Sequence, residues 1–374
     1  MMTERKTIVV SAVNLRKGGT LTILRDCLRH LSSMAGEYRI VALVHKRELC
    51  DFPGIEYIEM PDVIKSWVRR LWCEYVTMYK VSERLHPVYL WLSLHDTTPR
   101  VKADIQAVYC QTSFPFYRWS YRDFMMDYKI PLFAMLTKYA YKINIRRNKY
   151  VIVQAEWLKE GLGKMLGVSA DKFLVAPPQK KLGGNVDEER RECHFFPGYT
   201  FLYAATPDCH KNFETLCRAA ALLEKDLGQD KFRVILTISG TENKYAGWLY
   251  KKWGNCPSID FTGFMSKKKL YTYYQMCNCL VFPSKVETWG LPVSEFMVFE
   301  KPMLLADLPY AHETSVNSRR TAFFSPSSPE NLKELMKRLI TGDASFLSEV
   351  KCKGRRGTYM LYSWGDLFNA LLKG

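Results

Sequence analysis

Short apolar segments alternate along the chain with longer segments in which apolar side chains recur every three or four positions. The short segments are rich in Val, Ile and Leu and predict buried parallel strands, whereas the longer ones predict helices with one apolar face. The strands predicted in the first half are 7–13, 39–45, 55–59, 105–111 and 150–155. Those predicted in the second half are 200–205, 232–239, 258–264, 280–282 and 302–305. Strands separated by helices predict parallel βαβ units in both halves, and therefore an α/β protein.

Polar and charged residues fill the stretch 180–193, between the two halves. This composition is typical of a linker. A chain of 374 residues is also long enough for about two domains. We therefore predict a first domain at 1–185 and a second at 195–355, followed by a terminal segment, 356–374, that contains an amphipathic helix.

The composition is that of a soluble globular protein, with 47% hydrophobic and 25% charged residues. No apolar run approaches the roughly 20 residues that a membrane-spanning helix needs. The 11 cysteines show no paired zinc-binding spacing, and no signal peptide begins at Met1, so we expect free thiols and a cytoplasmic protein.

The net charge is +16, and residues 1–190 contain 30 Lys and Arg against 20 Asp and Glu. On electrostatics alone, this basic excess suits an anionic membrane surface or a nucleic acid. Residues 117–150 also interleave aromatic and basic side chains, a combination that can bind nucleic acid. However, the sequence has no helix-turn-helix, zinc-finger or RRM signature. We therefore predict an acceptor or membrane surface and no nucleic-acid partner.

A helix predicted within 65–85 has an unusual apolar face, which consists of Trp67, Val68, Leu71, Trp72 and Tyr75. Basic residues lie close to it in the sequence, as in amphipathic helices that lie in a membrane interface. The same pattern is equally typical of a helix whose apolar face packs on the protein core. The sequence leaves both interpretations open.

Residues 279–300 combine a buried strand, a polar loop and a helix start. The strand ends at Pro283-Ser284, and Pro292 has the residue type favoured in the first turn of a helix. Glu295 is predicted to lie in the same first turn, close to amides without a helical partner. A strand, a glycine-bearing loop and a helix start together present backbone N–H groups to an anion. The loop carries Glu287, Thr288, Trp289 and Gly290.

This stretch resembles the donor-binding signature of glycosyltransferase family 4, in which a Glu-x7-Glu pair surrounds a Gly-Leu-Pro-like centre. Glu287 and Glu295 match the pair, and Gly290-Leu291-Pro292 match the centre. The resemblance implies the GT-B fold, in which two Rossmann-like parallel-sheet domains face one another across a cleft. It also implies a retaining reaction and a terminal helix, within 356–374, that crosses back to the first domain. The match is strong over residues 200–320 and only general before them.

Resemblance to the family also implies roles for the candidate site residues. Glu287 would hold hydroxyls of the donor sugar, and Glu295 would accept hydrogen bonds from the ribose hydroxyls. Lys211, at a strand-to-helix junction, matches the family's phosphate-binding lysine; Glu287 and Lys211 are the predicted catalytic residues. The other predicted donor contacts are Gly18, Gly19, Gly263, Phe264, Thr288, Trp289, Gly290 and Leu291.

The sequence departs from the family pattern in two places. The family commonly has an arginine shortly before the phosphate-binding lysine, but residues 206–210 read TPDCH. Gln111 stands where a histidine is often found, so we predict no catalytic histidine. No Asp-x-Asp sequence occurs, which fits GT-B enzymes in which lysine and backbone amides replace a metal ion. We predict no essential metal and no cofactor, because the nucleotide-sugar is a substrate.

The prediction that follows is a retaining glycosyltransferase that moves a hexose-type sugar from a nucleotide-sugar donor to a lipid-linked glycan acceptor. It would build a cell-surface polysaccharide, such as lipopolysaccharide or capsule, as a peripheral protein on the inner face of the cell membrane. Two alternatives remain open from the residues alone. One is a GT-B-fold sugar-nucleotide epimerase, and the other is a non-catalytic protein that binds nucleotide-sugars or nucleic acid.

Overall fold

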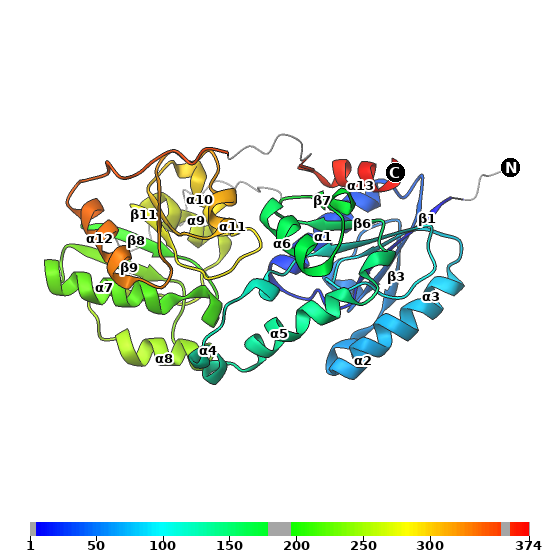
Figure 1. Cartoon of the computed structure of the whole chain (residues 1–374), viewed down its shortest axis with the longest axis horizontal. Helices are drawn as coiled ribbons and strands as arrows, with labels where there is room; N and C mark the ends of the chain where they lie inside the picture. Colours follow the sequence, from blue (N-terminus) through cyan, green and yellow to red (C-terminus); the bar gives the residue numbers. More distant parts are fainter. Residues whose placement is uncertain (1–4, 179–195, 353–359, 374) are drawn as a thin grey trace. The chain divides into compact units, whose positions relative to one another are not determined.

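The computed structural model describes residues 5–178, 196–352 and 360–373. The chain divides into two compact units (Figure 1). The first contains Met1–Pro115, Leu136–Gln179 and Arg355–Gly374, and the second contains Phe116–Met135 and Lys180–Gly354. Residues 116–135, which the sequence pattern assigns to the first domain, therefore belong to the second unit. The predicted linker at 180–193 lies outside the described residues.

The described part of the first unit contains a seven-stranded parallel sheet with the order β3-β2-β1-β4-β5-β6-β7. The strands are β1 (Thr7–Ala12), β2 (Arg39–Val44), β3 (Ile55–Glu59), β4 (Val88–Ser93), β5 (Ile105–Cys110), β6 (Tyr150–Val153) and β7 (Phe173–Val175). The helices are α1 (Gly18–Ser33), α2 (Trp67–Trp72), α3 (Met78–Arg84), α6 (Glu156–Leu166) and α13 (Trp364–Lys373). Short helical turns are η1 (Arg47–Leu49), η2 (Pro61–Lys65), η3 (Cys73–Thr77), η4 (Phe114–Phe116), η5 (Ile145–Arg147) and η6 (Ala170–Lys172).

Strand β1 shows why this sheet has helices on both faces. Every residue of β1 is buried, and successive side chains of a strand point to opposite faces. Ile8 belongs to the core cluster that contains Leu28 of α1, whereas Val9 belongs to the cluster that contains Met78 of α3. A strand that is apolar on both faces is typical of a parallel sheet between two helical layers.

The described part of the second unit contains a six-stranded parallel sheet with the order β10-β9-β8-β11-β12-β13. The strands are β8 (Tyr199–Tyr203), β9 (Phe232–Leu236), β10 (Ile259–Phe261), β11 (Cys279–Phe282), β12 (Met303–Ala306) and β13 (Thr321–Phe324). The helices are α7 (Phe213–Leu227), α8 (Lys244–Trp253), α9 (Lys267–Met276), α10 (Leu291–Phe296), α11 (Pro309–Thr314) and α12 (Pro329–Ile340), with the turns η8 (Cys209–Lys211) and η9 (Met297–Phe299). Helix α4 (Tyr121–Met126) and the first part of α5 (Lys129–Lys142) also belong to this unit.

The terminal helix α13 packs on the first unit (Figure 1, red). Its buried residues Leu367, Phe368 and Leu371 join the same core cluster as α1. The ring of Phe368 stacks on that of His30 in α1, with 5.6 Å between the ring centroids. The described end of the chain is thus fixed to the unit in which the chain begins.

Helix α1 begins at Gly18, and the Thr20 hydroxyl in its first turn donates to the carbonyl of Lys17 at 3.1 Å. The helix predicted within 65–85 is divided into α2, a π-helical turn at η3, and α3. On α2, Trp67 and Trp72 are each 64% exposed, so these two side chains do not pack on the core.

Among the described residues, no helix is both long and apolar enough to cross a bilayer.

Candidate functional site

The candidate site lies where two neighbouring strands of the second sheet end. β8 and β11 are adjacent and parallel, so the loops that follow them start from the same edge of the sheet. The strand order also reverses between them, since the chain continues from β8 to β9 on one side and from β11 to β12 on the other. Ligands of open α/β sheets bind at such a switch point, outside the carboxyl ends of the strands.

These two loops bring together Lys211 and Glu287, which are 76 positions apart in the sequence. The Nζ atom of Lys211 lies 2.6 Å from Oε1 of Glu287, and the two side chains are only 16% and 13% exposed. Both predicted catalytic residues are therefore at one place, as a shielded ion pair. The pair holds a cation and an anion where the two loops meet. An anionic group of a ligand can therefore replace Glu287 beside Lys211, and a hydrogen-bond donor of a ligand can replace Lys211 beside Glu287.

Hydrogen bonds between the loops fix this arrangement. The Tyr203 hydroxyl donates to the carbonyl of Lys211 (2.7 Å) and also contacts the Ser284 hydroxyl (3.0 Å). The backbone N–H of Lys285 donates to the carbonyl of His210 at 2.7 Å. Asn212, in the left-handed conformation that asparagine tolerates, donates its side-chain amide to the carbonyl of Pro283 at 3.0 Å. The cation-bearing turn and the carboxylate-bearing loop are thus parts of one bonded structure.

Gly290 permits the sharp change of direction between the loop and α10. It precedes the helix with φ of +87°, a conformation that other residues rarely adopt. Pro292 lies in the first turn of α10, as predicted. Glu295 does not: the helix begins at Leu291, so its first turn ends at Ser294 and Glu295 starts the next one. The prediction of Glu295 beside the unpaired amides is therefore wrong.

Glu295 has a separate environment within the second unit. Its Oε1 lies 3.4 Å from Nζ of Lys267, in the first turn of α9, and its side chain is mostly buried. Burial raises the pKa of Glu295 above the ordinary carboxyl value, and Lys267 opposes this shift. A partly buried carboxylate beside one exposed lysine is able to accept hydrogen bonds from a polyhydroxy ligand.

The remaining predicted contacts of the second unit are on its loops. Thr288 and Trp289 are half-buried, and the carbonyl of Trp289 accepts a hydrogen bond from the Thr314 hydroxyl. Among the described residues, the buried indole N–H of Trp289 has no hydrogen-bond partner. Phe264, in the loop after β10, is 89% exposed next to Gly263, which has φ of +77°. Leu291 is also exposed.

Gly18 and Gly19 belong to the first unit, where they begin α1 directly after the loop that follows β1. A Cβ atom added to either glycine would meet no atom within 4 Å. The backbone at the start of α1 is therefore open to an approaching group.

At the end of β5, the side-chain amide of Gln111 donates to the carbonyl of Leu94 at 2.6 Å.

The sequence pattern does not single out a polar cluster at the carboxyl end of β4. His95 is buried, with Nε2 3.0 Å from the Ser11 hydroxyl of β1. The carboxylate of Asp96 accepts the backbone N–H of Gln111, which links the loops after β4 and β5. Burial lowers the pKa of His95 to about 4 and raises the pKa of Asp96 to about 6.

These two shifts predict a compensated pH dependence of stability. Between pH 6.5 and 4, His95 binds a proton only in the unfolded chain, so its protonation destabilises the protein as the pH falls. Between pH 6 and 4, Asp96 binds a proton only in the folded chain, so its protonation stabilises the protein as the pH falls. Asp96→Asn keeps an acceptor for the Gln111 N–H but removes the second effect. Its free energy of unfolding should fall below pH 6 by about 1.4 kcal/mol per pH unit more steeply than that of the wild type.

Urea unfolding at pH 6.5, 5.5 and 4.5 measures this difference, with Asp51→Asn, at an exposed position, as the control that should follow the wild type. Parallel pH curves for Asp96→Asn and the wild type would contradict the assigned shifts.

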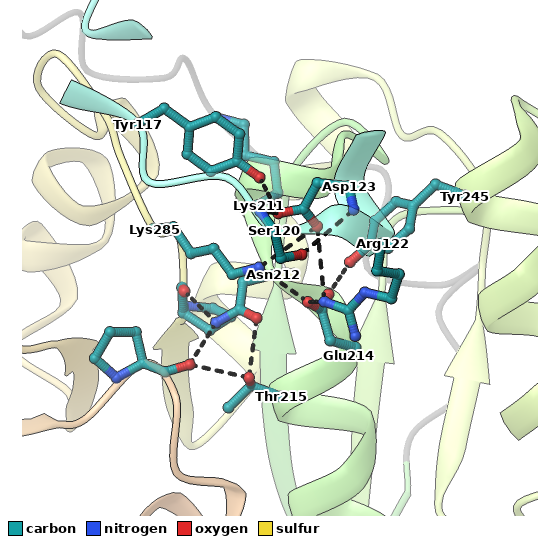
Figure 2. Close-up of polar contacts among 12 residues, drawn as sticks. Tyr117, Ser120, Arg122, Asp123, Lys211, Asn212, Glu214, Thr215, Tyr245 and Lys285 are labelled. Atoms are coloured by element: carbon teal, nitrogen blue, oxygen red, sulfur yellow. Dashed lines mark hydrogen bonds and ion pairs between the residues drawn. The ribbon is translucent and has the colours of Figure 1, made fainter. Parts of the chain in front are cut away.

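A second group that the sequence does not reveal is a charge cluster formed by Arg122, Asp123, Glu214 and Lys285 (Figure 2). Arg122 and Glu214 are 92 positions apart, and no local signal in either segment pairs them.

Among the described residues, no group of three or more His, Cys, Asp or Glu side chains is arranged to hold a metal ion.

Comparison with known proteins finds a family model that matches the part of the chain carrying this site. Residues 187–355 match the model of the family described as glycosyl transferases group 1. A 205-residue stretch is 22% identical to the O-antigen chain mannosyltransferase RfbU of Salmonella typhimurium and covers 54% of each protein. A 187-residue stretch is 26% identical to the serotype-specific mannosyltransferase WbdA of Escherichia coli, covering 49% of this chain and 22% of WbdA. The matches thus span about half of the first relative and less of the second.

The fold comparison extends over both units. The sucrose-phosphate synthase of Thermosynechococcus elongatus has a TM-score of 0.64 and 15% identity, with 92% of this chain and 91% of that chain covered. The predicted fold class, an α/β protein with the two Rossmann-like parallel sheets of the GT-B fold, is confirmed. Residues 187–355, the stretch that matches the glycosyl transferases group 1 model, carry Lys211, Glu287 and Glu295.

Proposed function

We propose that this protein is a retaining glycosyltransferase that moves a hexose-type sugar from a nucleotide-sugar donor to a lipid-linked glycan acceptor. The observation that carries the proposal is the Lys211–Glu287 ion pair at the carboxyl ends of β8 and β11. It places one cation and one carboxylate at the switch point of the domain that matches the family. The mannosyltransferase relatives support a role in the synthesis of a cell-surface polysaccharide.

In the proposed reaction, the diphosphate of the donor takes the place of Glu287 beside Lys211. The ammonium group then stabilises the negative charge that builds on the diphosphate as its bond to the sugar breaks. The acceptor hydroxyl bonds the same sugar carbon and passes its proton to the departing phosphate. Glu287, released from Lys211, accepts hydrogen bonds from hydroxyls of the sugar and holds the ring in place. Glu295 and the exposed ring of Phe264 are the proposed contacts of the nucleoside, with Gly263 allowing the turn.

The remaining donor contacts follow the same proposal. Thr288, Trp289, Gly290 and Leu291 would line the phosphate and sugar from the loop before α10. Gly18 and Gly19 would let the donor approach the backbone at the start of α1, because no side chain covers it and a Cβ atom at either position would meet nothing within 4 Å. A hydrogen bond from the unpartnered indole N–H of Trp289 to the ligand would satisfy a group that the described residues leave unpaired.

A screen of nucleotide-sugars tests this function directly. Purified protein is heated with UDP-, GDP-, dTDP- and CMP-sugars, and a ligand that binds the folded protein raises the melting temperature by mass action. We expect one nucleotide class to stabilise the wild type and Glu287→Gln to lose part of that effect. Sugar transfer to lipid-linked glycans is then measured with that donor. Absence of any stabilising nucleotide-sugar would refute the proposal, whereas conversion of the donor to an isomer without an acceptor would indicate an epimerase.

We also propose that the reaction needs no divalent metal ion. Lys211 supplies the positive charge next to the proposed diphosphate position, and the sequence has no Asp-x-Asp pair to hold an ion there. Transfer should proceed within about twofold of its ordinary rate in excess EDTA, because lysine and amides stabilise the leaving group. Initial rates with EDTA, with and without added Mg²⁺, measure this. Loss of transfer that Mg²⁺ restores would contradict the prediction.

The proposed partner beside the donor is an anionic membrane surface on the cytoplasmic side. On α5, five apolar side chains repeat at helical spacing and are all exposed: Leu132, Met135, Leu136, Tyr139 and, just after the helix, Ile143. Exposed Lys138 and Lys142 lie on or at the end of the same helix. On α2, Trp67 and Trp72 are exposed, and Lys65 and Arg69, close to them in the sequence, are exposed as well. Apolar faces with basic borders fit the interface of a bilayer that contains anionic lipids.

Vesicle binding tests this surface. Trp67→Ser/Trp72→Ser removes two exposed rings without opening a core cavity, and we expect it to weaken binding to phosphatidylglycerol-containing vesicles by about tenfold or more. Tyr362→Ser, at another exposed aromatic residue, is the matched control and should bind as the wild type does. Sedimentation with vesicles of graded phosphatidylglycerol content gives the affinities. Equal binding of the double variant and the wild type would argue against α2 as a membrane contact.

A further inference from the structure

The charge cluster of Arg122, Asp123, Glu214 and Lys285 is a closed set of two cations and two carboxylates (Figure 2). The Nζ atom of Lys285 lies 3.1 Å from Oε1 of Glu214 and 3.8 Å from Oδ1 of Asp123. Arg122 forms an ion pair with the same Glu214 oxygen, and its Nη2 atom lies 3.7 Å from Asp123. Both carboxylates are almost completely buried, so each cation is shared between them.

Neutral donors bind the second oxygen of each carboxylate, while Oδ1 of Asp123 has ion-pair partners but no hydrogen bond among the described residues. The second oxygen of Glu214 accepts the hydroxyl of buried Tyr245. The Oδ2 atom of Asp123 accepts the Tyr117 hydroxyl at 2.9 Å and the backbone N–H of Ser120 at 2.8 Å. Buried ions that lack partners cost several kcal/mol each, so a cluster of this kind tolerates few alternative geometries. The cluster therefore fixes the positions of the chain segments that carry these four residues.

Two of those segments adjoin the Lys211–Glu287 pair. Lys285 is two residues before Glu287, and its N–H bonds the carbonyl of His210, next to Lys211. Arg122 and Asp123 come from α4, which packs on the turn η8 that ends at Lys211. The ring of Tyr117 also meets the ring of His210 edge-on, with 6.0 Å between their centroids. The turn and the loop that carry the ion pair thus both rest on the segment 116–126.

We propose that Arg122 and Asp123 are positioning residues for diphosphate binding. Through Lys285 and His210 they set the spacing of Lys211 and Glu287, although neither touches the diphosphate. This inference rests on the proposed function of the Lys211 site. It assigns the segment 116–126, which follows β5 in the sequence, to the donor site of the second unit.

Binding of inorganic pyrophosphate, UDP and GDP, measured by calorimetry, tests the proposal. Arg122→Met should weaken binding of the probe that binds the wild type by about tenfold, since small displacements of binding groups have large effects. Arg122→Lys keeps the charge and should recover most of this loss. Arg118→Met, at an exposed position of the same segment, is the matched control and should bind as the wild type does.

Combination with Lys211→Met separates positioning from general damage. If Arg122 acts through Lys211, Arg122→Met should cause less than about twofold further loss in a Lys211→Met background. Additive effects, or unchanged binding by Arg122→Met, would overturn the inference. If Arg122→Met does not fold, Tyr117→Phe replaces it; this removes one hydroxyl from Asp123 and should weaken binding about threefold, and unchanged binding would again overturn the inference. A wild type that binds none of the three probes would instead refute the proposed function.

Discussion

Lys211→Met should lower the rate of sugar transfer by about 10²- to 10³-fold while leaving the fold intact. The side chain of Lys211 is the cation of the ion pair at the switch point, and methionine has a similar length without the charge. Removal of one charge-stabilising group from an enzyme site commonly has an effect of this size. The loss should appear mainly in kcat, because the negative charge on the diphosphate grows as the sugar departs.

Steady-state rates with the donor found in the nucleotide-sugar screen measure this effect. Lys251→Met, which removes an exposed lysine of α8, is the control and should retain the rate of the wild type. A Lys211→Met protein with a normal melting temperature and a rate within threefold of the wild type would remove Lys211 from the catalytic site. A low melting temperature would call for the same measurement at a lower temperature.

Glu214→Leu should reduce the free energy of unfolding by about 3–5 kcal/mol, since it leaves cations in a buried site without their shared carboxylate. Arg122 and Lys285 then depend on Asp123 alone, and the Tyr245 hydroxyl loses its acceptor. Urea unfolding at pH 7 measures the loss from the shift of the midpoint at constant slope. An effect below 1 kcal/mol would show that the cluster does not hold the segment 116–126.

Two further variants give this prediction its controls. Glu334→Ala, on the exposed face of α12, removes a carboxylate without a buried partner set and should change stability by less than about 0.5 kcal/mol. Arg122→Met/Glu214→Leu removes a cation together with the carboxylate. It should be more stable than Glu214→Leu, because fewer buried charges remain unpaired.

The fold was predictable where the apolar pattern is unambiguous. Each strand that the pattern predicts is present, and the alternation with helices gives the parallel sheets. The pattern does not predict β4, β7 and β13, although they are no shorter than strands that it does predict, such as β1, β10 and β12. Apolar runs of this length fit a buried strand and a buried helix segment equally well, and only pairing with a neighbouring strand decides between them.

The site was predictable only in part, for a similar reason. Glu287, Gly290 and Pro292 lie within one short stretch, so their spacing predicts that they belong to one loop and the helix that follows it. The position of Glu295 depended on the first residue of α10, and a shift of one residue moves a side chain into the next turn. The ion-pair partners of Glu214 come from α4 and from the loop after β11, and no residue type in those segments specifies this contact.

The ion pair between Lys211 and Glu287 has a consequence for the end of the reaction cycle. In the donor-free protein, Glu287 already neutralises Lys211. In the proposed reaction, a loaded donor displaces this carboxylate but offers it sugar hydroxyls, whereas a spent nucleoside diphosphate displaces it and offers it no donor sugar. The carboxylate would therefore compete with the product for Lys211 and favour its release. A glycosyltransferase with this ion pair should therefore be inhibited only weakly by the nucleoside diphosphate that it releases.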